Sequence, residues 1–600
     1  MLGPRGASRR HASSEAGDED RLRLYQRQLH DRDYEVRLLE LQESSSPGGP
    51  ESGQAFTCRL QYFSLKDFAQ YVALSYCCGD LPNTRDLVIE NAKILVSETL
   101  LSALEQLWRM GHTRIWVDYL CINQDDNDEK NSQVRMMDII FSKAATVFAW
   151  LGTGDHDSDM AMAVLGASRP TEQFEPPEEI EIACDAVVRL LSRPYWTRCW
   201  VIQEICVARS PIIVCGARSV ALSTILNRLD TLGTSAPAQY AQYLISPLRQ
   251  MRYREQNKAS ALANINLIPL LVLSRRSLAS DPRDKLYALL PLAKDGRTLI
   301  PTPNYSQTVE QVFFDTARCT IEGHDRTDII LLAHRTRGVR DLPSWAPDWA
   351  NVHSQPPPWV LEILHERFPP RVVHNKIHGK ALQVQGIRYD TIVDLLDYTA
   401  YETERAINGP DPGYPDSESV ISNLYMGLTI GAEDQFHQVT VVRVLLGMCH
   451  EGNGSIASQR PSRLRNWFRH NANRFIGGAT LKRHLEICME TLSRGISTMG
   501  TSANIDTREQ TQSAIEQGFE RLERLRMVFA PTYRRGLRIV YRDAKRGDKI
   551  YFLQNCPLPV ILRRKTSGKM TFVGDIFVSK RFMQMIKSVP IGSMEAVYIE

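Results

Sequence analysis

Long apolar runs are absent from this sequence of 600 residues. The nearest approach, residues 267–273, is bracketed by Asn266 and Arg275 and is far shorter than the roughly 18 to 20 apolar residues of a membrane-spanning helix. The first twenty residues are rich in Gly, Ser, Arg and acids and lack the apolar stretch of a signal peptide. We therefore expect a cytoplasmic protein without a membrane span.

Metal-binding spacings are absent as well. The 12 cysteines are scattered, with no CxxC pair and no Cys/His cluster at zinc spacing, so free thiols and no metal site are expected. The GxxxxGK[ST], GxGxxG and GxSxG motifs are also missing. The sequence therefore does not predict a common phosphate-binding loop or the nucleophile elbow of a hydrolase.

An excess of charge of one sign is missing too. Lys and Arg number 72 against 69 Asp and Glu, so the composition does not favour nucleic acid as a partner. The short basic clusters at residues 563–565 and 580–581 lack interleaved aromatic residues and are interpreted as solvated surface.

The patterns that are present indicate several domains, because 600 residues exceed what one hydrophobic core usually fills. Residues 1–20 are expected to form a disordered tail. Strands are expected at residues 34–41, 56–62, 71–76, 114–118 and 146–151, with helices near residues 99–110 and from Asn127 or Asp128 to Ala144. This α/β alternation predicts a doubly wound parallel sheet whose ligand crevice lies at the carboxyl ends of the strands.

The remainder of the chain has a different character. Residues 153–185 are interpreted as an acidic insertion, and a helix is expected to start at Pro194 and run through Glu204. Residues 216–350 are predicted to be mainly helical. Residues 351–600 are predicted to be a C-terminal α+β region with a small β-rich part at the end.

Four sequence motifs are specific in both their residues and their order along the chain. They are YVALSYCCGD at residues 71–80, IWVDYLCINQ continuing to WLG at residues 115–152, RPYWTRCWVIQE at residues 193–204 and DPRDKLYALL at residues 281–290. Together they resemble the fungal heterokaryon-incompatibility (HET) domain, for which we expect bounds of 21–215 with core motifs at 71–204. LPSWAPDW at residues 342–349 resembles a segment found after such domains. Cys78 departs from the family, which usually has Trp there, and this departure makes an inactive paralogue one of the alternatives.

The resemblance implies a TIR/flavodoxin-like sheet, because the HET domain is thought to be related to the TIR fold. Some TIR domains cleave NAD, and the spacing of Trp200 and Glu204 is similar to that of their catalytic stretch. Glu204 is thus the candidate catalytic carboxylate of an NAD+ glycohydrolase, with NAD as substrate rather than cofactor. Trp196 and Trp200 would share a helix face with Glu204 and stack beside it. The alternative is an amphipathic helix with two core tryptophans and a surface glutamate.

Four further residues are candidates for contact with the ligand. Ser75 and Tyr76 end the strand at 71–76, Asp118 ends the strand at 114–118, and Asn123 follows on the next loop with Gln124. The alternative for Asp118 and Asn123 is turn capping.

Two charged clusters are interpreted as structural. Asp125, Asp128 and Glu129 lack the spacing of a calcium loop and are expected to form a solvated helix N-terminus. Arg283 and Asp284 are expected to form an ion pair or a cap.

The family implies self/non-self recognition that ends in programmed cell death or growth arrest. The partner would be a protein encoded by an incompatible allele or locus, and a homo-oligomer is the expected assembly of the chain. Three mechanisms stay open: NAD hydrolysis, a non-enzymatic assembly module, and an inactive paralogue.

Overall fold

The computed structural model divides the chain into two compact units, residues 1–309 and 310–600. The residues it describes are 15–31, 34–43, 56–67, 70–77, 85–90, 92–167, 177–231, 245, 248–250, 252, 265–324, 327–333, 341–351, 360, 375–396, 417–428, 441–442, 444–446, 463–476, 479–495, 505–533, 536–577 and 594–600.

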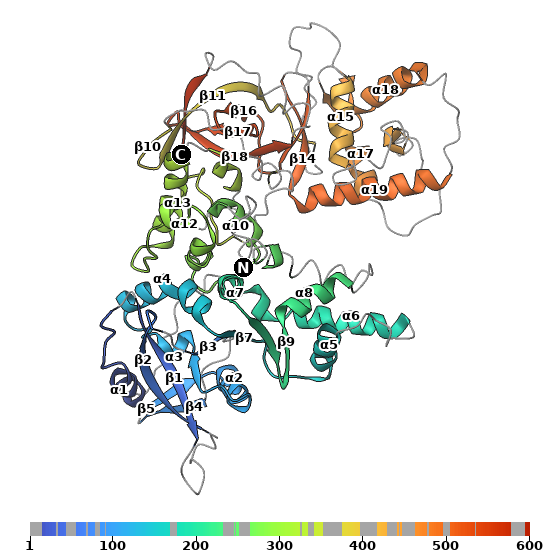
Figure 1. Cartoon of the computed structure of the whole chain (residues 1–600). Helices are drawn as coiled ribbons and strands as arrows, with labels where there is room; N and C mark the ends of the chain where they lie inside the picture. Colours follow the sequence, from blue (N-terminus) through green and yellow to red (C-terminus); the bar gives the residue numbers. More distant parts are fainter. Residues whose placement is uncertain are drawn as a thin grey trace. The chain divides into compact units, whose positions relative to one another are not determined.

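A nine-stranded sheet forms the centre of the first unit (Figure 1). In spatial order its strands are β5 (Ala92–Val96), β4 (Arg85–Ile89), β2 (Phe56–Ser64), β1 (Glu35–Glu43), β6 (Arg114–Trp116), β3 (Val72–Tyr76), β7 (Thr146–Trp150), β8 (Pro211–Cys215) and β9 (Arg218–Ala221).

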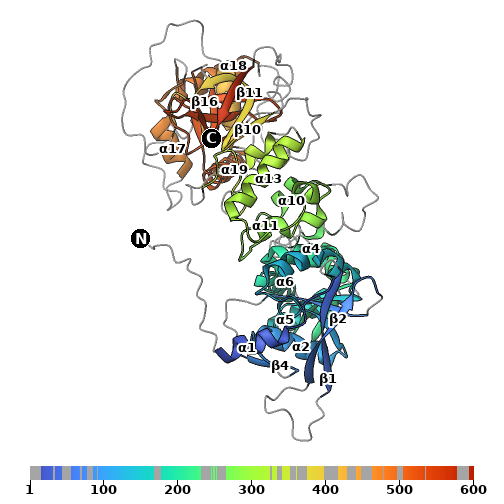
Figure 2. The same cartoon turned by 90° about the vertical axis from the view of Figure 1, so that its left-hand side faces the viewer.

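Four neighbouring strands, β6, β3, β7 and β8, run parallel to one another. The predicted β/α alternation is confirmed for them, and β3 is buried along its whole length. The expectation of a purely parallel sheet is wrong, because β1 pairs antiparallel with both β2 and β6, β4 with β5, and β8 with β9. Short connections join β4 to β5 and β8 to β9, and short connections favour antiparallel pairing. Figure 2 shows β1 and β2 as a long hairpin.

The helices of the first unit connect and cover these strands. They are α1 (Glu15–Leu24), α2 (Glu98–Arg109), α3 (Asp118–Cys121), α4 (Asn127–Lys143), α5 (His156–Gly166), α6 (Pro177–Leu191), η1 (Pro194–Thr197), α7 (Cys199–Cys206), α8 (Leu222–Thr231), α10 (Leu267–Leu273), α11 (Asp284–Tyr287), η2 (Leu290–Leu292) and α12 (Gly296–Leu299). Helix α1 begins within the stretch that was expected to be a disordered tail.

Helix α4 forms because its apolar residues recur on one face. Val134, Met137 and Phe141 are buried at the predicted spacing, against the main core of the unit. The cap is Asp126 rather than Asn127 or Asp128, since the Asp126 side chain accepts hydrogen bonds from the two backbone N–H groups that need a partner there.

Glu129 is not part of a solvated helix N-terminus, so that expectation is wrong. Its carboxylate forms a two-point ion pair with Arg37 on β1, at 2.6 and 3.0 Å, and both side chains are almost fully buried. The Arg37 guanidinium also lies 5.1 Å from the ring centre of Tyr25 and 5.3 Å from that of Tyr62. The pair joins the first strand to α4. Its two hydrogen bonds offset the free-energy cost of removing both charges from water.

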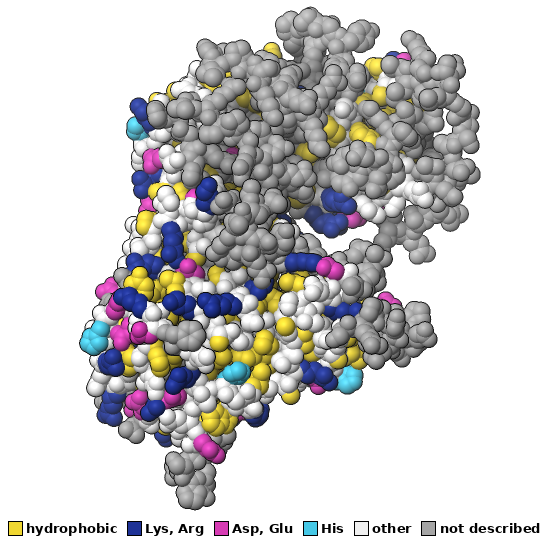
Figure 3. All heavy atoms as spheres, viewed as in Figure 1, with side chains coloured by type: hydrophobic (Ala, Val, Ile, Leu, Met, Phe, Trp, Pro, Cys, Tyr) yellow, Lys and Arg dark blue, Asp and Glu magenta, His cyan; other side chains and the backbone are white. Residues whose placement is uncertain are grey.

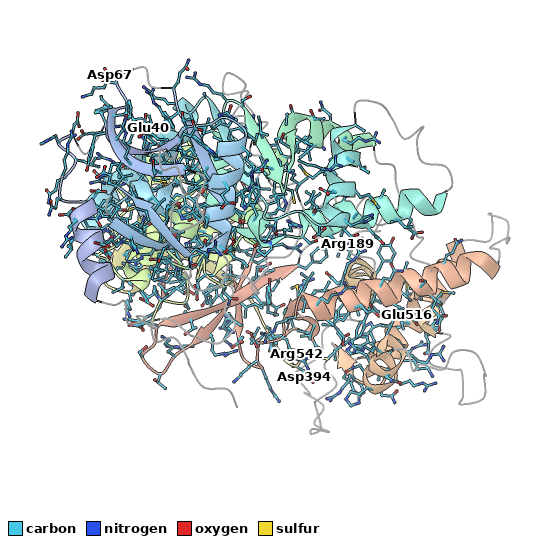
Figure 4. The ribbon with its side chains drawn as sticks, turned by 90° about the horizontal axis from the view of Figure 1, so that it is seen from below. Glu40, Asp67, Arg189, Asp394, Glu516 and Arg542 are labelled. Atoms are coloured by element: carbon cyan, nitrogen blue, oxygen red, sulfur yellow. The ribbon has the colours of Figure 1, made fainter. Side chains whose placement is uncertain are left out.

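Glu40, labelled in Figure 4, fixes the register of three strands. It lies on β1 directly opposite Arg59 of β2 and Arg114 of β6. Its carboxylate accepts a hydrogen bond from Arg59 Nε and lies 3.8 Å from Arg114 Nε. Opposite charges on facing strands favour this alignment.

The second unit contains an eight-stranded, mainly antiparallel sheet. Its strands are β10 (Lys376–His378), β11 (Ala381–Thr391), β14 (Met527–Pro531), β15 (Leu537–Tyr541), β16 (Lys549–Leu553), β17 (Val560–Arg564), β18 (Met570–Phe577) and β19 (Glu595–Ile599). Because β19 pairs with both β11 and β18, the strands β11, β16, β17, β18 and β19 close into a ring. The expected β-rich C-terminal part is confirmed, and it also recruits β10 and β11 from far upstream.

Helices accompany this sheet in the second unit. They are α13 (Val309–His324), η3 (Asp328–Leu332), α15 (Ser417–Leu428), α17 (Arg463–Asn471), α18 (Leu481–Gly495) and α19 (Ile505–Arg524), with a minor hairpin of β12 (Phe475–Ile476) and β13 (Ala479–Thr480). In the LPSWAPDW segment, Trp345 is fully buried and donates a hydrogen bond to the carbonyl of Lys380 at 3.0 Å.

Across the described residues, no helix is both long enough and apolar enough to cross a membrane. Figure 3 shows lysine and arginine side chains of the first unit interspersed with acidic ones on the face in view.

The Arg37–Glu129 pair yields a stability prediction. Glu129→Gln leaves the Arg37 charge buried without its counter-ion, so local stability should fall by about 3 to 5 kcal/mol. The double variant Arg37→Met, Glu129→Leu should recover most of this loss. Hydrogen exchange of β1 and α4 amides measures the effect.

The control Glu105→Gln breaks a surface pair with Arg109 and should cost less than about 1 kcal/mol. Equal effects of Glu129→Gln and Glu105→Gln would contradict a structural role for the pair.

Candidate functional site

The candidate site lies where the order of the parallel strands reverses. From β3 the chain passes to β6 on one side of it, and β6 then connects to β7 on the other side. In doubly wound sheets, ligands bind at the carboxyl ends of the strands beside such a reversal. Ser75 and Tyr76 end β3, and Asp118 follows two residues after Trp116 at the end of β6.

Ser75 is the centre of a buried hydrogen-bonded group. Its side chain is 2% exposed, and its hydroxyl donates a hydrogen bond to Oε2 of Glu204. The Ser75 Oγ also lies 2.8 Å from the hydroxyl of Tyr195, which is buried in η1. Three residues that are distant in sequence thus meet at the end of β3.

Glu204 is carried by α7 and is 2% exposed. Burial raises the pKa of its carboxyl group to about 7, because desolvation disfavours the charged form. The positive charge of Arg198 and the hydrogen bond from Ser75 act against this rise, whereas the negative charge of Asp118 adds to it. The carboxyl can therefore exchange a proton near neutral pH, as functional carboxyl groups often do.

Arg198 is a site residue that the sequence motifs did not predict. It has an extended backbone between η1 and α7, with φ −70° and ψ 137°, and its guanidinium donates a hydrogen bond to the carbonyl of Tyr76. Its charge acts to lower the pKa values of both Asp118 and Glu204. No signal in the sequence pointed to it, because Arg198 falls inside the single helix expected from Pro194 through Glu204.

Asp118 is half-buried at the start of α3. Burial raises the pKa of its carboxyl group, and Arg198 partly offsets this rise. Its Oδ1 accepts a hydrogen bond from the backbone N–H of Tyr119 at 2.7 Å, and its carbonyl accepts one from Gln124 at 3.0 Å. Asp118 therefore combines a role in the turn with an electrostatic influence on Glu204.

Asn123 and Tyr76, which were predicted to contact the ligand through their side chains, have other roles in the structure. The Asn123 side chain accepts a hydrogen bond from the N–H of Asp125, and its own N–H donates to Glu129, which is the turn-capping arrangement. The Tyr76 side chain is 2% exposed, so this residue contributes its carbonyl to the contact with Arg198.

The expectation of one helix from Pro194 through Glu204 is wrong. The chain forms η1, breaks at Arg198 and starts again as α7, because residues 197–199 pair through their backbones with Leu278. Trp196 therefore does not share a helix face with Glu204. Its indole donates to the carbonyl of Leu190 at 3.2 Å, and its ring meets that of Tyr195 edge-on.

Trp200 and Glu204 do lie one turn apart on α7, but they have different partners. Trp200 packs against the main core, and its side chain lies near the carboxylate of Asp284, whose pKa it acts to lower. It does not form a free stacking wall beside Glu204.

Gly152 and Arg193, from the sequence motifs at residues 115–152 and 193–204, have clear structural roles. Gly152 ends β7 with φ +107°, which L side chains rarely adopt. Arg193 donates to the carbonyls of Leu151 and Thr153 on either side of it. The predicted end of the strand at Gly152 is confirmed.

Among the described residues, no group of three or more His, Cys, Asp or Glu side chains is placed so that it could hold a metal ion. The cysteines of that part are free thiols. Cys78 and Asp80 lie outside the described residues, so the departure from the family at Cys78 has no structural account.

The arrangement can hold a proton or a negative charge next to a ligand. Glu204 supplies a carboxyl group with a pKa near neutrality, Ser75 orients it, and Arg198 supplies a positive charge nearby. A carboxylate in such a setting can stabilise a developing cation or exchange a proton with a substrate.

Comparison with known proteins gives two matches. Residues 71–204 match the family model described as heterokaryon incompatibility protein (HET). The chain is also similar to heterokaryon incompatibility protein 6, OR allele, of Neurospora crassa, with 26% identity over 402 residues, which cover 54% of this chain and 58% of that protein. The chain thus matches little more than half the length of this relative. No solved structure matches the chain.

The raised pKa of Glu204 predicts how stability depends on pH. The folded state retains a proton on this group up to about pH 7, whereas the ordinary pKa is 4.5. The folded state therefore binds more protons between these values, and the stabilisation is lost as the pH rises through about 7. The loss should be on the order of 3 kcal/mol.

Denaturant unfolding of the wild type and of Glu204→Gln, at pH 5 and pH 8, tests this. The wild type should lose stability at the higher pH relative to Glu204→Gln, which has no proton to release. Glu105→Gln, on the surface of α2, should behave like the wild type. An identical pH dependence in the wild type and Glu204→Gln would contradict the raised pKa.

Proposed function

Because residues 71–204 form a HET domain, we propose that this protein is a heterokaryon-incompatibility factor whose HET domain hydrolyses NAD+ through Glu204. The consequence of this hydrolysis would be growth arrest or programmed cell death, when the protein meets the product of an incompatible allele or locus. The observation that carries the enzymatic part is the buried Glu204 carboxyl, held by Ser75 at the end of β3.

The recognition role is supported by both comparisons. The family model spans the predicted core motifs, and the similar Neurospora crassa protein is named as a heterokaryon incompatibility protein with an allele designation. The proposed partner is therefore a protein rather than a nucleic acid or a membrane. In this proposal, the chain beyond the HET domain senses the partner or restrains the domain, and the assembled state is a homo-oligomer.

The proposed TIR-like character is supported by the order of the parallel strands. Numbered along the chain, β3, β6, β7 and β8 are first to fourth, and they lie side by side in the order second, first, third, fourth. Flavodoxin-like sheets have this order and bind their ligands beside the first strand. The antiparallel β1–β2 and β4–β5 hairpins are additions to it.

The chemistry fits a carboxylate of this kind. Cleavage of the bond between nicotinamide and ribose develops positive charge on the sugar, and a nearby carboxylate stabilises that charge. Burial makes the interaction stronger than it would be in water. The hydroxyl of Ser75 fixes the carboxylate, and the half-buried Asp118 and Arg198 are the proposed contacts for the ribose and the phosphates of NAD+.

A second candidate is supported by the same contacts. The hydrogen bonds between Ser75, Tyr195 and Glu204 tie α7 and η1 to β3, and a purely structural role would account for their burial. The HET domain would then signal by assembly without chemistry.

Cellular NAD separates the two candidates. Cells that overexpress the full chain, so that its homo-oligomer forms without the partner, should lose NAD and stop growing, whereas cells that express Glu204→Gln at the same level should retain NAD at the level of an empty-vector control. Glutamine keeps the shape of the side chain but cannot supply a negative charge. The matched control Glu105→Gln, on the surface of α2, should deplete NAD as the wild type does.

The opposite result has a definite meaning. Growth arrest with unchanged NAD, in both the wild type and Glu204→Gln, would reject hydrolysis and favour assembly. A soluble, folded Glu204→Gln protein is a condition of the test, and the pH-dependent unfolding measurement establishes it.

A further inference from the structure

The DPRDK block lies beyond the matched residues 71–204, yet it contacts the helix that carries Glu204. Residues 274–305, which we call the clasp, contain Leu278, the α11 helix and Tyr305. Helix α11 contacts α7 within the first unit.

The first contact of the clasp sets where α7 begins. The N–H of Leu278 donates to the carbonyl of Thr197 at 2.5 Å, and the N–H of Cys199 donates to the carbonyl of Leu278 at 2.9 Å. Arg198 and Leu278 thereby form an isolated parallel bridge. A strand-like pairing at this point stops η1 and fixes the first turn of α7.

The second contact is made by Asp284 at the start of α11. Its carboxylate accepts a hydrogen bond from the hydroxyl of Tyr305 at 2.6 Å, and the helix that it begins contacts α7. Burial raises the pKa of Asp284, and interactions with Tyr305 and with Trp200 on α7 act to lower it. The carboxylate thus joins α7 to the end of the clasp.

The third contact is made by Gln203, which is fully buried next to Glu204. With its amide oriented to satisfy both neighbours, Gln203 donates to the carbonyl of Ala288 at 3.1 Å and accepts from the N–H of Asp138 on α4 at 2.8 Å. One side chain therefore joins α7, α4 and the clasp.

The clasp is itself anchored to α4. The N–H of Tyr305 donates to Oδ1 of Asn131 at 3.2 Å, and the ammonium group of Lys130 lies 4.6 Å from the Tyr305 ring centre. Nη2 of Arg297 donates to both carboxylate oxygens of Asp138, at 2.8 and 2.9 Å. Because α4 packs on the main sheet, the clasp holds α7 relative to the ends of the strands.

The clasp also carries its own internal support. The buried ammonium group of Lys285 donates hydrogen bonds to the carbonyls of Arg275 and Ser277, which precede Leu278. Arg283 pairs with Asp281 at 2.6 Å and donates to the carbonyl of Tyr305 at 2.7 Å. The DPRDK residues thus divide their roles: Arg283 and Lys285 shape the clasp, and Asp284 reaches α7.

We infer that the clasp is part of the working HET unit and that Asp284 is a positioning residue, which holds α7 and thereby sets Glu204 against Ser75. Asp284 touches neither Ser75 nor Glu204 and acts through Trp200. Its relevance to catalysis rests on the proposed function, but its hold on α7 does not.

Hydrogen exchange of the full chain tests the hold on α7 without any assay of activity. Asp284→Ala removes the carboxylate that lies between Tyr305 and the side chain of Trp200, so amide exchange within α7 should become about tenfold faster or more. Trp200→Phe keeps an aromatic ring in the core but loses the indole N–H and part of the ring, so it should speed α7 exchange as well. This second variant keeps the test valid if Asp284→Ala does not fold.

Two controls make the result specific. Trp108→Phe, on α2, is a matched substitution away from the clasp and should leave α7 exchange unchanged. Exchange within α2 should be unchanged in Asp284→Ala. An unchanged α7 in both Asp284→Ala and Trp200→Phe would overturn the inference, and so would an equal acceleration of α7 and α2, which would indicate general loosening.

Activity then separates this inference from the proposed function. In Asp284→Ala, NAD loss should be slower than in the wild type, and Asp284→Asn, which keeps one acceptor oxygen, should restore part of it. Fast α7 exchange in Asp284→Ala together with no NAD loss in the wild type would uphold the clasp and reject the NAD hydrolysis.

Discussion

The buried carboxyl group of Glu204 is the constraint that organises the first unit around the candidate site. An acid with almost no exposure is costly to ionise, and the surrounding contacts reduce that cost without removing it. Ser75 donates a hydrogen bond to it from β3, and Arg198 places a positive charge nearby. The result is a pKa of about 7, which makes the group responsive at the pH of a cell.

Each of these contacts depends on elements that are distant in the chain. The β3 strand supplies Ser75 because it lies in the middle of the parallel strands, and α7 supplies Glu204 only because its N-terminus is fixed by Leu278. The Arg37–Glu129 pair holds α4 on the first strand, and α4 in turn holds the clasp. The site is therefore a property of residues 35–305 together, which extends beyond the matched residues 71–204 on both sides.

Local patterns predicted the parts of this arrangement that local forces determine. Buried runs gave β3 and β7, and helical spacing gave α2 and α4 with only small errors at their ends. The split of the expected helix at Arg198 was not predictable, because its cause is a backbone pairing with a residue 80 positions away. The burial of Glu129 was hidden for the same reason, since its partner Arg37 lies on a distant strand. The sequence motifs predicted roles for Ser75 and Glu204, whereas the roles of Arg198 and Asp284 became evident only from their contacts in the structure.

The release of nicotinamide from NAD+ by the purified 600-residue chain, at concentrations high enough for the proposed homo-oligomer to form and measured from pH 5 to pH 9, tests the central claim most directly. The ionised form of Glu204 is the one that stabilises positive charge on the ribose. The account predicts a rate that rises as the pH passes through about 7, then levels off, and is lost in Glu204→Gln. Release that is absent at every pH, or that persists in Glu204→Gln, would contradict it.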